Sequence, residues 1–254
     1  SYLSSFNFTA MIKKSVFLLF FLVLTPFLSA QSGRDHYLKG EKAYQAQQYQ
    51  EAIKAFDMAI QLQFSPIDKA YYFRGMAKQN ISQYEGAISD LNEAIRLNPN
   101  DMSYYFARST NYAITTQYEL AIEDYNRLIA NGSGNAKLYL SRGFAYVSLK
   151  NYALAIDDFN RVIALNPNDQ KAYNNRGSMY LNLQQYADAI ADFDKALSID
   201  SRFFYAYLNK GRALVGLQQY EAAMEAFKKG EAINNSLTFY LADKQIAEKA
   251  LQQK

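Results

Sequence analysis

The chain has 254 residues, no cysteine and one histidine, and its 27 Lys and Arg residues against 24 Asp and Glu residues give a net charge of +3. Lys13 and Lys14 are the only charged residues before position 31, so the rest of the chain holds 25 cations against 24 acids. A nucleic-acid-binding protein would carry a clustered basic face, which this balance does not predict. Without cysteine, disulfide bonds cannot stabilise the fold, and a metal site of several His or Cys ligands is not expected.

The N-terminal segment has the layout of a secretory signal peptide. Two lysines precede an apolar run at 16–24, and small residues end at Ala30 before polar sequence begins. We therefore expect residues 1–10 to be an upstream extension and residues 11–30 to be a cleaved signal peptide. The mature protein would then act in the periplasm of a bacterium or be secreted, with no stable membrane anchor. An uncleaved anchor is the alternative, although the apolar run is shorter than the roughly 20 residues that cross a bilayer.

One motif recurs six times downstream, at a spacing of 34 to 35 residues. Each copy has a small residue, an alanine twelve positions later, and a bulky apolar or aromatic residue four positions further on. The small residues are Gly40, Gly75, Ser109, Gly143, Gly177 and Gly211; the alanines are Ala52, Ala87, Ala121, Ala155, Ala189 and Ala223; the bulky residues are Phe56, Leu91, Tyr125, Phe159, Phe193 and Phe227. A fixed period of this length predicts stacked two-helix units, each of which buries its apolar face only against a neighbour.

Copies four and five resemble the tetratricopeptide repeat family. Copy four reads Tyr139-x-x-Arg142-Gly143-x-x-Tyr146, Ala155-x-x-x-Phe159 and Pro167, similar to that family's Trp-x-x-Leu-Gly-x-x-Tyr, Ala-x-x-x-Phe and Pro pattern. Tyrosine replaces the family tryptophan, Arg or Lys replaces its leucine, and the first copy is weakest, with His36 as a packing residue in the aromatic place. The resemblance implies an all-α, right-handed solenoid of six helix pairs, at residues 33–67, 68–101, 102–135, 136–169, 170–203 and 204–235.

The apolar pattern inside one copy predicts two antiparallel helices. In copy four, residues 136–149 and 152–165 each show apolar residues at helical spacing, separated by a Lys-Asn pair. Gly143 and Ala155 fall where these helices should cross, and their small side chains would let the two backbones approach closely.

The connections between copies carry helix stop and start signals. Asp101 and Asp169 end Leu-Asn-Pro-Asn-Asp segments and are predicted to cap the next helix. Residues 131–135 contain two glycines instead of a proline turn, which favours a flexible joint there. Residues 236–253 are predicted to form one amphipathic capping helix, with Ser236 as its possible N-cap.

A charged pattern repeats with the same period. Four arginines are each followed sixteen residues later by an aspartate, whereas the first and last copies have Ala55 and Ala226 at the aspartate position. The arginines are Arg74, Arg108, Arg142 and Arg176, and the aspartates are Asp90, Asp124, Asp158 and Asp192. We favour partly buried ion pairs that set the repeat register over a charge ladder that binds a ligand. Pairing within a repeat and pairing with the next repeat both remain open.

The resemblance also implies a concave groove lined by the first helix of each pair. Residues three before, one after and four after each marker position should face it, and the predicted partner-binding residues are Tyr37, Tyr44, Tyr72, Met76, Phe106, Leu140, Phe144, Val147, Asn174 and Arg212. The alternative for the apolar members is packing between helices. The family's lysine and asparagine clamp for C-terminal carboxylates is absent, and the polar residues Asn174, Asn175, Asn182 and Asn209 are an alternative predicted contact for a peptide backbone.

The sequence therefore predicts a non-enzymatic scaffold or adaptor that binds protein or peptide partners outside the cytoplasm. We expect no catalytic residues and no cofactor or metal site, since no phosphate loop, nucleophile elbow or metalloprotease motif is present. The balanced charge predicts no nucleic-acid partner. The alternative function is an accessory structural subunit of an envelope enzyme or secretion complex.

Overall fold

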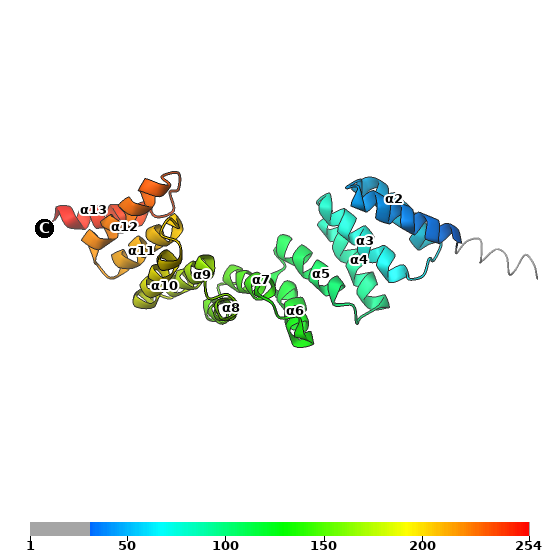
Figure 1. Ribbon diagram of the computed structural model, residues 1–254, viewed down its shortest axis with the longest axis horizontal. Coiled ribbons are helices and arrows are strands. Elements are labelled where there is room, and N and C mark those ends of the chain that lie inside the picture. Colours follow the sequence, from blue (N-terminus) through cyan, green and yellow to red (C-terminus); the bar gives the residue numbers. More distant parts are fainter. Residues whose placement is uncertain (1–30, 254) are drawn as a thin grey trace, which may run out of the picture. The chain divides into compact units, whose positions relative to one another are not determined.

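The computed structural model describes residues 31–253, and all regular elements among them are helical (Figure 1). The predicted upstream extension and signal peptide lie outside the described residues. Residues 31–45 are helical, and they are followed by α2 (Tyr49–Gln61), α3 (Ile67–Asn80), α4 (Tyr84–Leu97), α5 (Met102–Ile114), α6 (Tyr118–Leu128), α7 (Ala136–Ser148), α8 (Tyr152–Leu165), α9 (Gln170–Asn182), α10 (Tyr186–Ile199), α11 (Phe204–Gly216), α12 (Tyr220–Ile233) and α13 (Leu241–Gln252). The predicted all-α repeat fold is confirmed.

The described helices form two compact units that divide between Gln117 and Tyr118. The first unit ends with α5, and the second begins with α6, so the two helices of the third copy fall in different units. Within each unit, each helix from α2 onward packs against the next along the chain. This neighbour-to-neighbour packing is how a repeat protein builds a continuous core from units that cannot fold alone.

Small residues allow the two helices of a pair to approach each other closely. A Cβ atom added to Gly75 would lie 3.2 Å from the carbonyl oxygen of Ala87, so the predicted glycine and alanine do meet. A Cβ atom added to Gly177 would lie 2.8 Å from Cε1 of Phe193 and 3.1 Å from Cβ of Asp192. Phe193 itself is fully buried. The marker glycine thus makes room for the bulky ring of the second helix.

The connections between pairs follow the predicted signals in two places. The carboxylate of Asp101 accepts the backbone N–H of Ser103, and that of Asp169 accepts the N–H of Lys171, which confirms both N-caps. Residues 129–133 form a π-helical turn in which Gly132 has a φ of +82°. The boundary between the two units therefore does not coincide with the predicted joint at 131–135.

The C-terminal helix is shorter than predicted. It begins at Leu241 rather than near residue 236, and Ser236 does not cap it. The Ser236 backbone N–H and hydroxyl instead donate to Oδ1 of Asn234, at 2.9 and 2.7 Å. Such a local side-chain turn competes with helix formation, which explains the late start. Helix α13 packs on α11 and α12, and it buries Tyr240 against Phe227.

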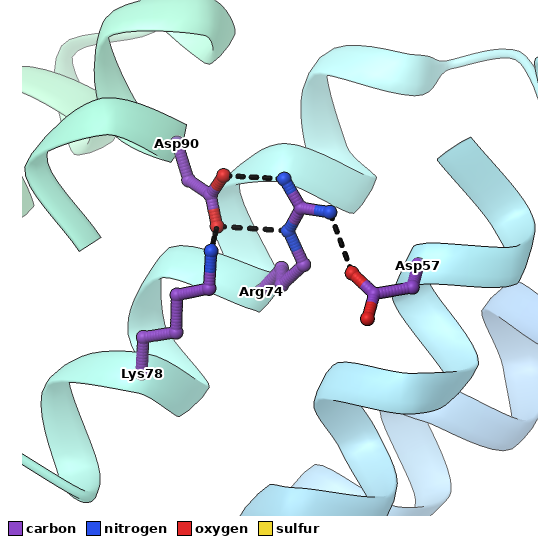
Figure 2. A network of polar contacts seen from close by, with 4 residues as sticks. All are labelled: Asp57, Arg74, Lys78 and Asp90. Atoms are coloured by element: carbon purple, nitrogen blue, oxygen red, sulfur yellow. Dashed lines mark hydrogen bonds and ion pairs between the residues drawn. The ribbon is translucent and has the colours of Figure 1, made fainter. Parts of the chain in front are cut away.

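Arginine and aspartate meet within the second, fourth and fifth repeats, as Figure 2 shows for the second copy. Arg74 of α3 donates from Nε and Nη2 to the two carboxylate oxygens of Asp90 in α4, at 2.9 and 2.5 Å. Its Nη1 donates to Oδ1 of Asp57 in α2 at 2.6 Å, and Lys78 pairs with Asp90 at 2.9 Å. One guanidinium therefore joins three helices.

The second unit repeats this arrangement. Arg142 and Arg176 bind both oxygens of Asp158 and Asp192, at 2.6 to 2.9 Å, and donate Nη1 to Asn126 and Asn160 of the preceding second helix. The aspartate thus pairs within its repeat, and an asparagine supplies the contact to the preceding repeat. Asp158 is only 1% exposed, and both of its oxygens are engaged, so the structural interpretation of the ladder is confirmed for these pairs. The hydrogen bonds that the two guanidinium groups donate to Asp158 and Asp192 raise the pKa of both arginines, which keeps them charged.

The close approach at Gly177 predicts a cost for any added side chain. We expect Gly177→Ala to lower the free energy of unfolding by roughly 1 to 3 kcal/mol, because the new methyl group would overlap the Phe193 ring. Urea denaturation measures this change. Gly86→Ala is the matched control, since its Cβ would meet only the flexible end of Lys78, at 3.3 Å. Equal midpoints for wild type and Gly177→Ala would contradict the packing described.

Candidate functional site

The first helices of three consecutive pairs in the second unit line a groove of about 390 Å3. The lining residues are Leu140 and Phe144 of α7, Asp169, Lys171, Ala172, Asn174 and Asn175 at the start of α9, and Phe203 and Tyr205 at the start of α11. Three predicted partner-binding residues, Leu140, Phe144 and Asn174, are therefore brought together here. A volume of this size falls within the usual range for binding pockets.

Two aromatic side chains give the groove its apolar walls. Phe144 is 47% exposed, and its ring meets the buried Phe159 edge to face, with centroids 5.8 Å apart. Tyr205 is 41% exposed and lies against the ring of Phe204, at a centroid distance of 4.2 Å. Exposed apolar surface rimmed by polar residues is typical of interaction sites. Both rings are held in place by neighbouring rings while much of their surface stays accessible.

The start of α11 departs from the capping pattern of the chain. Phe203 occupies the N-cap position and makes no side-chain hydrogen bond there, whereas Asp101 and Asp169 cap the equivalent helices. Replacing a capping residue in this way costs about 0.5 to 2 kcal/mol. Phe203 contributes to the wall of the groove instead. Natural proteins tend to break a local rule where function requires it.

Polar side chains continue from the groove toward the C-terminal helix. Asn209 of α11 donates its amide to Oδ1 of the buried Asn174, at 3.1 Å. Arg212 donates to Oδ1 of Asn209 at 3.4 Å and from Nε to Asp243 of α13 at 3.0 Å. This row ties α9, α11 and α13 together. Asn182 lies apart from it and donates to the carbonyl of Ser178.

The two charged side chains that line the groove, Asp169 and Lys171, differ in whether they have a hydrogen-bonding partner. The carboxylate of Asp169 accepts the backbone N–H groups of Lys171 and Ala172. The Lys171 ammonium makes no hydrogen bond or ion pair within residues 31–253. The mouth of the groove therefore carries one unpaired positive charge.

The other predicted partner-binding residues have varied surroundings. Tyr37 is only 8% exposed, and its ring packs among Phe56, Phe64 and Phe73, so its observed role is in the core. The others are half-buried. Tyr44 contacts Tyr49 and Phe73, and Tyr72 contacts Phe73 and Tyr104. Val147 packs in the core of the fourth pair, Arg212 pairs with Asp243 of α13, and Met76 and Phe106 lie on α3 and α5. A binding role for these residues stays a prediction.

Sequence reasoning missed Phe203, Tyr205 and Lys171. A signal was present, because a run of three aromatic residues at 203–205 follows the fifth copy where copies two and four end in Pro-Asn-Asp. Within residues 31–253 no group of three or more His, Asp or Glu side chains is arranged to hold a metal ion. No helix in the same range combines the length and the apolar character that crossing a bilayer requires.

Comparison with known families identifies the repeat. Models of the tetratricopeptide repeat match residues 68–101, 136–169, 171–203 and 204–236, which together make up more than half of the chain. The chain belongs to the tetratricopeptide repeat family. Proteins of this family bind protein or peptide partners. No curated protein matches the chain.

Solved structures share this fold. A structure of YrrB, described as a tetratricopeptide repeat protein with an unusual peptide-binding site, is 22% identical over 76% of this chain and 100% of its own, with a TM-score of 0.65. A MamA structure is 25% identical over 68% of this chain and 97% of its own, with a TM-score of 0.62. MamA from Desulfovibrio magneticus RS-1 is 18% identical over 67% and 96%, with a TM-score of 0.61. The first and third, below 25% identity, show the fold alone.

Proposed function

We propose that the protein is a non-enzymatic scaffold that binds a peptide segment of a partner protein in the groove between α7, α9 and α11. The observation that carries this proposal is that the exposed rings of Phe144 and Tyr205, each packed against a neighbouring ring, line one groove. Single exposed apolar residues are common on protein surfaces, but two exposed aromatic rings that line one groove form a binding site for an apolar side chain.

The groove offers the two contacts that a peptide needs. An apolar side chain of the partner is buried against the rings, and removal of about 100 Å2 of apolar surface from water would contribute roughly 2.5 kcal/mol. The half-buried amide of Asn175 can donate to a backbone carbonyl and accept from a backbone N–H. The rings supply affinity, and the amide fixes the direction of the backbone.

Removal of the two rings should weaken binding without unfolding the protein. A random peptide library displayed against the full chain supplies ligands, and we expect Phe144→Ala combined with Tyr205→Ala to raise the Kd of selected peptides by roughly thirtyfold, about 2 kcal/mol. Calorimetric titration measures the change. Leu154→Ala with Leu165→Ala is the matched control, since these α8 side chains are 46% and 56% exposed but do not line the groove. Selected peptides that bind the double variant as tightly as wild type would refute the proposed site.

We further propose that the protein acts outside the cytoplasm. The support is the order of two lysines, a short apolar run and a small residue at Ala30. Export with cleavage predicts that protein isolated from its native host begins at Gln31, which an intact-mass measurement determines. A chain that keeps residues 11–30 and remains in the membrane fraction would rule out cleavage.

A further inference from the structure

Asn174 is a buried amide at a position that is apolar in the neighbouring copies. It lies three residues before the marker glycine of copy five, where copies four and six have Leu140 and Leu208. Its side chain is 9% exposed and lines the groove between α7, α9 and α11. Burying an amide costs stability unless its polar atoms are hydrogen-bonded, so the partners of its oxygen and nitrogen decide what it can do.

A chain of hydrogen bonds that begins at Arg212 fixes the orientation of Asn174. Nη1 of Arg212 donates to Oδ1 of Asn209 at 3.4 Å, and because a guanidinium has donors only, Asn209 must present its oxygen there. Nδ2 of Asn209 then faces two acceptors, Oδ1 of Asn174 at 3.1 Å and Oγ of Ser178 at 3.4 Å. The Ser178 hydroxyl donates its hydrogen to the backbone carbonyl of Asn174 at 2.8 Å, so toward Asn209 it acts as an acceptor.

Arg212 is itself held by the C-terminal helix. Its Nε donates to Oδ2 of Asp243 in α13 at 3.0 Å, and its guanidinium carbon lies 5.6 Å from the centroid of the Phe239 ring. Helix α13 packs on α11, which carries both Arg212 and Asn209. The C-terminal helix therefore keeps the first donor of the chain in place.

The chain ends in an unused donor. Oδ1 of Asn174 accepts from Asn209, whereas Nδ2 of Asn174 makes no hydrogen bond within residues 31–253. In the same range, the one fully buried side-chain oxygen or nitrogen without a partner is Oδ1 of Asn111, so Nδ2 of Asn174 keeps access to the surface. Because Asn174 lines the groove, this N–H group can donate to a ligand there.

The charges of the groove give no preference for an anion. Asp169 and Lys171 are the charged side chains among its lining residues, and their charges cancel. An uncharged acceptor suits an amide donor, and a carbonyl oxygen is the acceptor that every residue of a peptide carries.

We propose that Asn174 donates to a carbonyl oxygen of the bound segment, and that Asn209 and Arg212 are positioning residues that keep its amide in this orientation. The inference rests on the proposed peptide-binding function. The carbonyl belongs to the backbone of the partner or to a Gln or Asn side chain. Hydrogen bonds in a chain polarise one another, so the charged Arg212 strengthens the last donor. A segment that presents an N–H group at this point would place two donors against each other, which selects against it.

The orientation of the amide is tested without a ligand by Asn209→Asp. An aspartate here accepts from Arg212 and has no donor for Asn174, so the Asn174 amide should turn over and donate Nδ2 to it. We expect hydrogen exchange of the Asn174 side-chain NH2 group, followed by NMR, to slow roughly tenfold, which corresponds to about 1.4 kcal/mol. Asn182→Asp is the matched control, since Asn182 is an exposed residue of α9 outside the groove. Exchange as fast in Asn209→Asp as in wild type would overturn the orientation described.

The ligand is tested with peptides selected from a random library on the full chain. Each backbone carbonyl of a selected peptide is replaced in turn by a thiocarbonyl, which is a weaker acceptor, and each Gln or Asn side chain by Met or Leu. We expect one of these changes to raise the Kd for wild type roughly tenfold, about 1.4 kcal/mol, and to have little effect on Asn174→Ala and Asn209→Asp. The kind of change that acts shows whether the carbonyl belongs to the backbone or to a side chain.

The outcomes separate this inference from the proposed function. Selected peptides that bind the variant with Phe144→Ala and Tyr205→Ala as tightly as wild type refute the groove itself. Peptides that require both rings, but respond to every carbonyl change equally in wild type and Asn174→Ala, refute the donor role of Asn174 alone. A wild-type chain that is insensitive to every change refutes that role even if Asn174→Ala and Asn209→Asp fail to fold.

Discussion

Three of the repeats, copies two, four and five, depend on one buried contact, in which an arginine of the first helix holds an aspartate of the second. Moving a carboxylate from water into a protein core is costly, and Asp158 is almost fully buried. The cost is offset because Arg142 forms two charge-assisted hydrogen bonds to it, and the guanidinium also lies over the rings of Tyr139 and Tyr146. Apolar burial drives folding, whereas this contact selects which helices pair and in which register.

The candidate groove lies where the repeat pattern changes. Phe203 stands where copies two and four have a capping aspartate, and it lines the groove instead. The copies with Asp101 and Asp169 show the capped alternative at this position. Departures from a periodic sequence therefore point to function more directly than its regular positions.

The periodic part of the structure could be predicted from the sequence because it depends on local pattern. Helix α8 spans Tyr152–Leu165, as predicted, and the Asp caps and the close glycine contacts are confirmed. The choice of partner for each aspartate could not be predicted, since a basic residue of the same copy and one of the next copy are both compatible with the spacing. The asparagines sixteen residues before Arg142 and Arg176 were visible in the sequence, and they could have indicated the contact to the preceding repeat.

Non-periodic features required the structure. The turn at Asn234 shortens α13 through a hydrogen bond that no hydrophobic pattern encodes. Tyr37 occupies a position predicted to face a groove, but the aromatic side chains around it form a core. Of the predicted partner-binding residues, only Leu140, Phe144 and Asn174 line the same groove.

The central claim is that arginine and aspartate act as one unit, and a double-mutant cycle on Arg142 and Asp158 tests it most directly. Unfolding free energies are measured for wild type, Arg142→Met, Asp158→Ala and the double variant. We predict that Asp158→Ala alone costs roughly 3 kcal/mol and that the double variant costs far less than the sum of the single changes, with a coupling of about 2 kcal/mol. Additive effects, within about 0.5 kcal/mol, would show that the two residues do not support each other and would contradict this account of the fold.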